Sequence, residues 1–174
     1  MRPAVRALWL ILSISAAGQM ARAADCTADP GPRAAVVDYL TAMQEKRFED
    51  AYAHVTATMT DGRPREEWAD LQRKMFELGG VSLGAPDARP AHRASRADGS
   101  CEDAAKVPNV LRATDVMNNQ GSTEFEVYTV LQQDGVWRVD SQATLFDDAA
   151  IKTWFPNDSV PEFKGTAPAG AEQP

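Results

Sequence analysis

Four side chains in this sequence are candidates for acid–base catalysis: Tyr39, His54, Asp115 and Asp140. A carboxyl group held in an apolar pocket has its pKa raised towards neutral pH, so that it can exchange a proton with a substrate. A nearby tyrosine hydroxyl could then stabilise the oxyanion that forms. One hypothesis is therefore an isomerase- or dehydratase-like enzyme that uses Asp115 or Asp140 with Tyr39.

Each of these residues also has a structural interpretation, which we favour. Asp115 lies next to a polar turn, where aspartate is usually solvated. Asp140 shares strand parity with Arg138, which favours a solvent-facing ion pair. His54 is expected at the rim of a short helix, and Tyr39 at the margin of the core. We therefore assign a catalytic role to none of them.

A basic segment, RPAHRASR, spans Arg89 to Arg96 in an otherwise acidic chain. Its three arginines, Arg89, Arg93 and Arg96, could bind an anionic ligand or the acidic surface of a partner. The alternative is an edge strand whose charges discourage the addition of a further strand. We favour this alternative.

Motifs for other chemistries are absent from the sequence. It contains no Gly-x-Ser-x-Gly elbow, no nucleotide-binding glycine motif and no metal-binding pair of histidines. Hydrolase, kinase and metalloenzyme functions therefore have no support, and we expect neither a cofactor nor a metal.

The first 23 residues read as a cleavable signal peptide. Arg2 and Arg6 precede an apolar run, and Ala21-Arg22-Ala23 places small residues at the −3 and −1 positions of a cleavage site. The apolar run is too short for a membrane span, which needs about 20 residues. We predict cleavage after Ala23, a periplasmic or secreted protein, and no membrane span after the signal is removed.

Net charge limits the classes of partner. The chain carries 18 basic and 25 acidic residues, and removal of residues 1–23 takes away three arginines and no acid. The remaining 15 basic and 25 acidic residues give a net charge of −10. Because phosphate binding needs a basic surface, nucleic acid and anionic membranes are disfavoured as partners.

Cys26 and Cys101 are the only two cysteines, and both follow the predicted signal peptide. In an oxidising compartment we expect them to form a disulfide. Two lone cysteines cannot make a zinc site, which needs three or four protein ligands.

The stretch from Ser122 to Gln142 predicts a β-hairpin. Its first arm alternates between two faces, and after a Gln-Asp-Gly turn the alternation resumes through Trp137 and Val139. Because a hairpin alone is not stable in water, other elements must cover its apolar face.

Helical patterns precede this hairpin at residues 33–46, 48–55 and 64–79. Pro64 opens the last of them, Gly79-Gly80 closes it, and its expected buried stripe is Trp68, Leu71, Met75 and Leu78. Residues 88–97 are expected to form an edge strand, residues 109–117 a further strand, and the residues before Pro156 a short helix. We expect one domain, residues 24–156, and a disordered tail, residues 157–174.

Two features suggest binding rather than catalysis. Trp68 and Trp137 could line a ligand pocket, although each also fits the apolar stripe of its element, so that core membership is the default. Tyr128 and Val130 are expected on the outer face of the hairpin, where exposed apolar side chains suggest a two-fold interface. Homodimerisation is therefore a hypothesis.

Helices followed by a curled antiparallel sheet that ends in Asp134-Gly135-Val136-Trp137-Arg138-Val139 resemble the nuclear transport factor two-like superfamily. Phe48-Glu49-Asp50-Ala51-Tyr52 and Glu67-Trp68 also match, and the resemblance covers residues 31–145. It implies an α+β, cone-shaped roll like that of SnoaL-like and cystatin-like proteins, with a pocket at the open end. The chain is most similar to small secreted bacterial members without an assigned activity.

The resemblance does not decide function, because this fold supports both enzymes and binding domains. SnoaL-like enzymes often carry a histidine late in the last strand, whereas residues 140–144 here contain none. We therefore expect an exported non-catalytic binding or accessory domain of the cell envelope, with a small apolar ligand or an envelope protein as its partner. The alternative is the isomerase- or dehydratase-like enzyme with a carboxylate base in the cone pocket.

Overall fold

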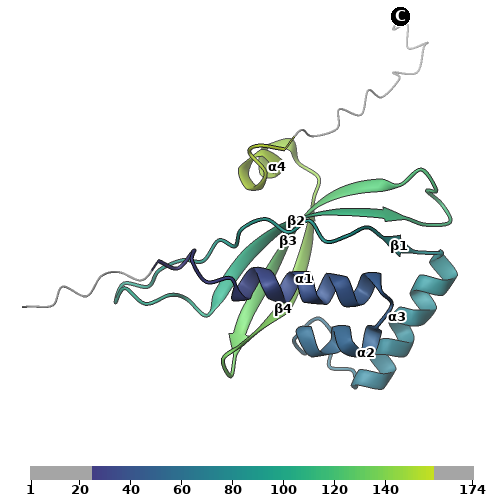
Figure 1. Cartoon of the computed structure of the whole chain (residues 1–174), viewed down its shortest axis with the longest axis horizontal. Helices are drawn as coiled ribbons and strands as arrows, with labels where there is room; N and C mark the ends of the chain where they lie inside the picture. The colour runs from purple at the N-terminus through teal and green to yellow at the C-terminus, as the bar shows by residue number, and fades with distance from the viewer. Residues whose placement is uncertain (1–24, 159–174) are drawn as a thin grey trace, which may run out of the picture.

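The computed structural model describes residues 25–158 (Figure 1). The predicted signal peptide and all but two residues of the predicted tail lie outside this range. No helix among the described residues is long and apolar enough to cross a membrane. The elements follow in the order α1 (Gly31–Gln44), α2 (Phe48–Ala51), the 3₁₀ helix η1 (Tyr52–His54), α3 (Arg65–Gly79), β1 (Ser82–Leu83), β2 (Ala104–Thr114), β3 (Ser122–Gln133), β4 (Val136–Leu145) and α4 (Asp148–Trp154).

The helices begin and end where local chemistry requires it. α3 follows Pro64 and is capped at its C-terminal end by Gly80, which has the left-handed φ of 57° that glycine adopts without a steric penalty. The predicted helix at residues 48–55 is divided, because α2 ends at Ala51 and the chain continues as η1. The short helix before Pro156 is confirmed as α4.

The four strands form one antiparallel sheet in the order β1-β2-β3-β4. The predicted hairpin is the β3–β4 pair, and its turn residues Asp134 and Gly135 both have positive φ, as tight hairpin turns require. The sheet is curled, with the N-terminal helices packed on it, so the α+β prediction is confirmed.

The predicted edge strand at residues 88–97 is only partly formed. Ala88 and His92 pair with Asn109 and Lys106 of β2 in isolated bridges, and Ser95 pairs with Cys101. Pro90 interrupts the segment, because proline has no N–H to donate to a ladder.

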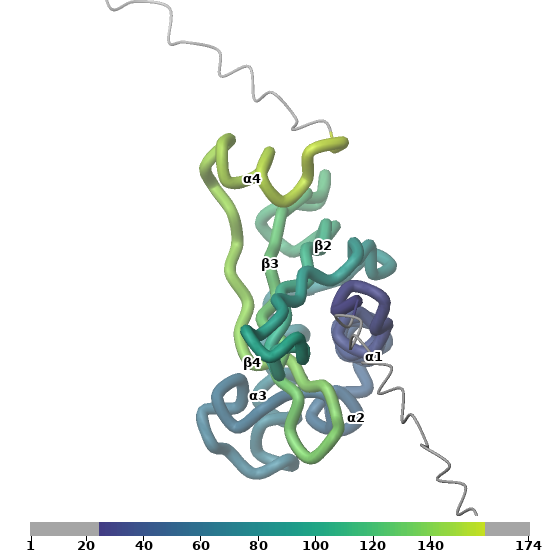
Figure 2. The backbone as a smooth tube through the Cα atoms, turned by 90° about the vertical axis from the view of Figure 1, so that its left-hand side faces the viewer, coloured from purple at the N-terminus to yellow at the C-terminus, as the bar shows by residue number. Residues whose placement is uncertain are grey.

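Two clusters of buried side chains lie on opposite faces of the sheet. The larger contains both Trp68 and Trp137, so the expected core membership of these residues is confirmed. The smaller joins Phe125 to Ile151 and Phe155 of the α4 region. Figure 2 shows α4 at the opposite end of the molecule from α2 and α3.

The prediction for the faces of β3 was wrong. Tyr128 and Val130 are not on the outer face but buried against the helices, and the ring of Tyr128 lies 6.4 Å from that of Tyr39 in α1. Phe125 and Val127 face the other way, and Phe125 packs on Phe155 at 4.9 Å. β3 is buried on both faces along this stretch, so the outward apolar surface that suggested a two-fold interface does not exist.

The predicted buried stripe of α3 was also wrong in part. Trp68 is buried, but Leu71, Met75 and Leu78 are exposed. The helix packs instead through Trp68, Ala69 and Phe76, and Phe76 contacts Phe48 at 5.0 Å.

Candidate functional site

A carboxylate, Glu126 of β3, lies inside the fold and is only 1% exposed. Its Oε2 accepts hydrogen bonds from Nδ2 of Asn109 at 3.1 Å and from the hydroxyl of Tyr128 at 2.9 Å. Its Oε1 accepts a hydrogen bond from Nε2 of Gln142. We call Asn109, Glu126, Tyr128 and Gln142 the interior polar cluster.

Three adjacent strands build this cluster. Asn109 of β2 is the register partner of Glu126, and Gln142 of β4 is the register partner of Tyr128. Because residues two apart on a strand share a face, Glu126 and Tyr128 point to the same side, towards α1. Tyr39 of α1 packs beside them.

Burial dominates the electrostatics of the cluster. It raises the pKa of Glu126, and the hydrogen bonds from Asn109, Tyr128 and Gln142 oppose that shift only in part. Burial, with a contribution from the charge of Glu126, raises the pKa of Tyr39 to about 12 and that of Tyr128 well above its ordinary value.

The cluster has the residue types of an acid–base site, but a substrate cannot reach its carboxylate in this structure. A general base must lie within hydrogen-bond reach of the proton that it removes. Both oxygens of Glu126 are already engaged by donors of the protein, and the side chain is closed to solvent. A substrate could reach the carboxylate only if Gln142, which is itself exposed, moved aside.

The predicted catalytic candidates are not brought together. Asp115 is exposed in the turn after β2, where it accepts the backbone N–H groups of Met117 and Asn118. Oδ1 of Asp140 accepts a hydrogen bond of 2.7 Å from the hydroxyl of Thr56. His54 is half-buried at the end of η1. Only Tyr39 lies at the interior polar cluster.

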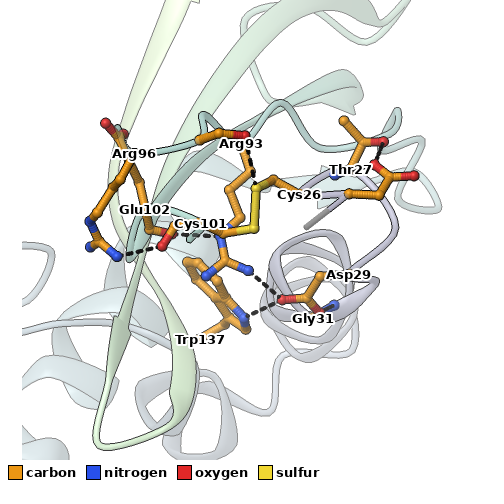
Figure 3. Close-up of polar contacts among 11 residues, drawn as sticks. Cys26, Thr27, Asp29, Gly31, Arg93, Arg96, Cys101, Glu102 and Trp137 are labelled. Carbon is orange, nitrogen blue, oxygen red and sulfur yellow. Dashed lines mark hydrogen bonds and ion pairs between the residues drawn. A yellow bond between two sulfur atoms is a disulfide. The ribbon is translucent and has the colours of Figure 1, made fainter. Parts of the chain in front are cut away.

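Arg93 is held by the chain itself, as Figure 3 shows. Its guanidinium bonds Oδ2 of Asp29 at 2.9 Å and lies 4.7 Å from the centre of the Trp137 ring. Nε1 of Trp137 donates to the same Asp29 oxygen at 3.3 Å. The predicted disulfide between Cys26 and Cys101 is present beside these residues.

The other two arginines of the basic segment are also engaged. Arg89 forms ion pairs with Asp87 at 2.7 Å and Asp158 at 2.6 Å. Arg96 pairs with Asp103 at 2.7 Å. Each of the three guanidinium groups of the basic segment therefore has an acidic partner within the chain.

The interior polar cluster was not predicted from the sequence, because the face of β3 that carries Tyr128 and Val130 was expected to be the outer one. A signal was present, since Glu126 has the same strand parity as Tyr128 and Val130. A carboxylate that shares a strand face with two large apolar residues is a candidate for burial, because those residues favour an internal position for that face.

Large apolar side chains gather at the end of the molecule where α3 meets the β2–β3 turn. Leu78, Val116 and Met117 are 84%, 68% and 91% exposed, and the N–H of Val116 bonds the carbonyl of Gly79 at 2.9 Å. We call Met75, Leu78, Val116 and Met117 the apolar end. A shallow hollow of about 390 Å³ lies over the ends of β1, β2 and β3, lined in part by Ser82, Arg112 and Ser122.

Residues 25–158 contain no group of three or more histidine, cysteine, aspartate or glutamate side chains that could hold a metal ion.

Comparison with known proteins identifies a fold but no function. No protein-family model matches the chain, and no curated protein matches it. Among solved structures, the chain is similar to RPA3114, a SEC-C motif-containing protein from Rhodopseudomonas palustris, with a TM-score of 0.50 and 12% identity over 67% of this chain and 80% of that one.

Three further solved structures match with lower TM-scores. A ketosteroid isomerase-like protein from Erwinia carotovora atroseptica matches with a TM-score of 0.46 and 20% identity, covering 67% of this chain and 95% of that one. A Nostoc punctiforme domain of unknown function with a cystatin-like fold matches with a TM-score of 0.47 and 17% identity, covering 71% and 80%. The match to Bd1075 of Bdellovibrio bacteriovorus covers only 38% of that protein.

Proposed function

We propose that this chain is an exported, non-catalytic binding domain of the bacterial cell envelope, in the form of a nuclear transport factor two-like cone. The proposal rests on the exposure of the four large apolar side chains of the apolar end. Large apolar side chains that are exposed at one end of a molecule are typical of sites for protein partners.

The non-catalytic part of the proposal is supported by the state of Glu126. Its two oxygens accept hydrogen bonds from Asn109, Tyr128 and Gln142, and its side chain is buried from solvent. A buried carboxylate that is satisfied in this way acts as part of the core.

The exported part is supported by the disulfide. Cys26 and Cys101 are joined, and disulfides persist mainly in oxidising compartments such as the periplasm or the cell exterior. The signal predicted in residues 1–23 is consistent with that location. N-terminal sequencing of the protein from the producing cell tests it: a mature chain that starts at Ala24 is expected, and an intact Met1 would contradict export by cleavage.

A partner that binds the apolar end must bury Leu78 and Met117. A photo-crosslinking amino acid placed at either position in the producing cell is expected to give a discrete adduct with one envelope protein. The matched control is the same amino acid at Val136, which is exposed in the β3–β4 turn region. Equal crosslinking at all three positions, or none at Leu78 and Met117, would contradict the proposal.

A second function is favoured by one observation, the raised pKa of Glu126 beside Tyr128. If Gln142 moves aside on binding, Glu126 becomes a base for removing a proton next to a carbonyl group, with Tyr128 as the hydrogen-bond donor. Deuterium exchange into enolisable ketones tests this activity. Exchange that is catalysed by the wild type and lost in Glu126→Gln would establish the enzyme and overturn the non-catalytic proposal.

A further inference from the structure

β4 is the last strand of the sheet, and most of its outer edge is uncovered. Near its start, Val55 forms a bridge with Val139, and the N–H of Thr56 donates to the carbonyl of Val139 at 2.9 Å. Beyond that point no other strand among the described residues pairs with this side of β4 until α4 begins. Figure 2 shows this half of β4 running along one side of the molecule. We call residues 140–146 the free edge.

The register shows which backbone groups the free edge presents. On β2, the carbonyl of Pro108 bonds the N–H of Arg89 on the side away from β3. Its partner on β3, Val127, therefore directs its own N–H and C=O towards β4, where it faces Ala143. Ala143 is thus bonded to β3, and the neighbouring Gln142 and Thr144 direct their N–H and C=O groups outward.

The free edge is complementary to a copy of itself. Its midpoint is Ala143, and an antiparallel copy related by a two-fold axis at this residue places Gln142 opposite Thr144 of the partner. Each such pair exchanges two backbone hydrogen bonds, so the two symmetric pairs make four. Ala143 faces its own copy in the narrow, non-hydrogen-bonded position, where a methyl group fits well.

The charges of the free edge agree with this pairing. Residues 141–145 are uncharged, so no like charges oppose one another, and Asp140 falls opposite the exposed Phe146 of the copy. Proteins that must stay monomeric usually protect such an edge with lysine, proline or a covering segment. None of these protects residues 141–145 in the part of the chain that the structure describes.

We propose that the free edge is a homodimer interface, in which the β4 strands of two copies pair antiparallel about a two-fold axis at Ala143. The interface joins the two four-stranded sheets edge to edge. A second copy is favoured over an extended foreign peptide because residues 141–145 carry no charge, so that their antiparallel copy opposes no like charges. The two-fold register also pairs the outward backbone groups of Gln142 with those of Thr144. This proposal is independent of the function proposed for the apolar end.

Charge substitutions at the axis test the proposal. Ala143 is exposed, so Ala143→Glu and Ala143→Lys are expected to leave the fold intact while placing two like charges face to face. By analytical ultracentrifugation, the wild type is expected at twice the monomer mass at tens of micromolar, and each variant at the monomer mass. An equimolar mixture of the two variants is expected to restore the dimer.

Two controls complete the experiment. Ala97→Glu adds the same charge at an exposed position outside the free edge and is expected to leave the dimer unchanged. Thr144→Pro removes an outward N–H without removing a hydrogen bond to β3, and is expected to weaken dimerisation at least tenfold. A wild type that stays monomeric at several hundred micromolar, with or without a bound peptide, would overturn the proposal. A dimer unaffected by Ala143→Glu would also do so.

Discussion

The hydroxyl of Tyr128 donates a hydrogen bond of 2.9 Å to the carboxylate of Glu126, two residues earlier on the same strand. Because positions i and i+2 of a strand share a face, β3 alone sets this pair and no loop is needed to align it. Asn109 and Gln142 reach the same carboxylate from the two neighbouring strands. The stability of the fold is therefore linked to the ionisation of Glu126.

Replacing Glu126 by glutamine should stabilise the protein at neutral pH. Burial raises the pKa of Glu126 in the folded state above the ordinary value of 4.5, so the folded protein retains this proton at pH values where the unfolded chain has lost it. The contribution of Glu126 to stability is therefore greatest below its pKa in the unfolded chain, and it declines as the pH rises through its pKa in the folded protein. Glutamine has no such dependence.

The measurement is the difference in melting temperature between Glu126→Gln and the wild type, followed from pH 4 to pH 8. We expect a difference that grows with pH and reaches at least about 2 °C at pH 8. Glu124→Gln, two residues away on the half-buried end of β3, is the control and should show a smaller change. A difference that shrinks as the pH rises would show that the donors around Glu126 outweigh its burial.

Tyr128→Phe should destabilise the fold by about 1–2 kcal/mol, because it leaves a buried carboxylate oxygen with one donor fewer. The ring and its contact with Tyr39 are retained. Tyr39→Phe is the matched control, since its hydroxyl makes no hydrogen bond with the described residues. Urea unfolding of both variants measures the difference, and equal losses would show that the ring environment, rather than the bond to Glu126, is responsible.

The features that could be predicted from the sequence are those set by local chemistry. Pro64 and Gly80 delimit α3 because proline fits before the first helical turn and glycine adopts the left-handed conformation that ends a helix. Asp134-Gly135 makes the hairpin turn for a similar reason. The pairing of Cys26 with Cys101 followed from the compartment that the sequence suggested.

The features that could not be predicted depend on which face another element covers. Phe125 and Tyr128 lie on opposite faces of β3, yet both are buried, because α4 covers one face and α1 the other. Alternation alone cannot distinguish this arrangement from a strand with one wet face. Because the face of β3 that carries Tyr128 was expected to be exposed, the buried position of Glu126 was not predicted. The exposure of Leu78 was not predicted for the same reason. Helical periodicity identifies an apolar stripe on α3, but it does not show whether another element packs against that stripe.

Loss of the disulfide should cost about 4 kcal/mol of stability on the chain-entropy model, because it closes a loop between residues that are 75 positions apart. The double variant Cys26→Ser/Cys101→Ser avoids a free thiol. Urea unfolding of this variant and of the reduced wild type should give the same loss. A wild type whose unfolding is unchanged by reductant would show that the bond contributes little to stability.

Gly31→Ala should destabilise the protein by about 1–3 kcal/mol, although alanine is the better helix former by about 1 kcal/mol. A Cβ atom at Gly31 would lie 2.5 Å from Cδ1 and 2.8 Å from Nε1 of Trp137. The indole cannot easily move away, because Asp29 accepts its N–H and Arg93 lies over its ring. Thermal unfolding measures the loss. In a Trp137→Val background, which has no atom at the δ position, the same substitution should cost nothing or stabilise the helix. An equal loss in both backgrounds would show that the backbone at Gly31, and not its approach to Trp137, requires glycine.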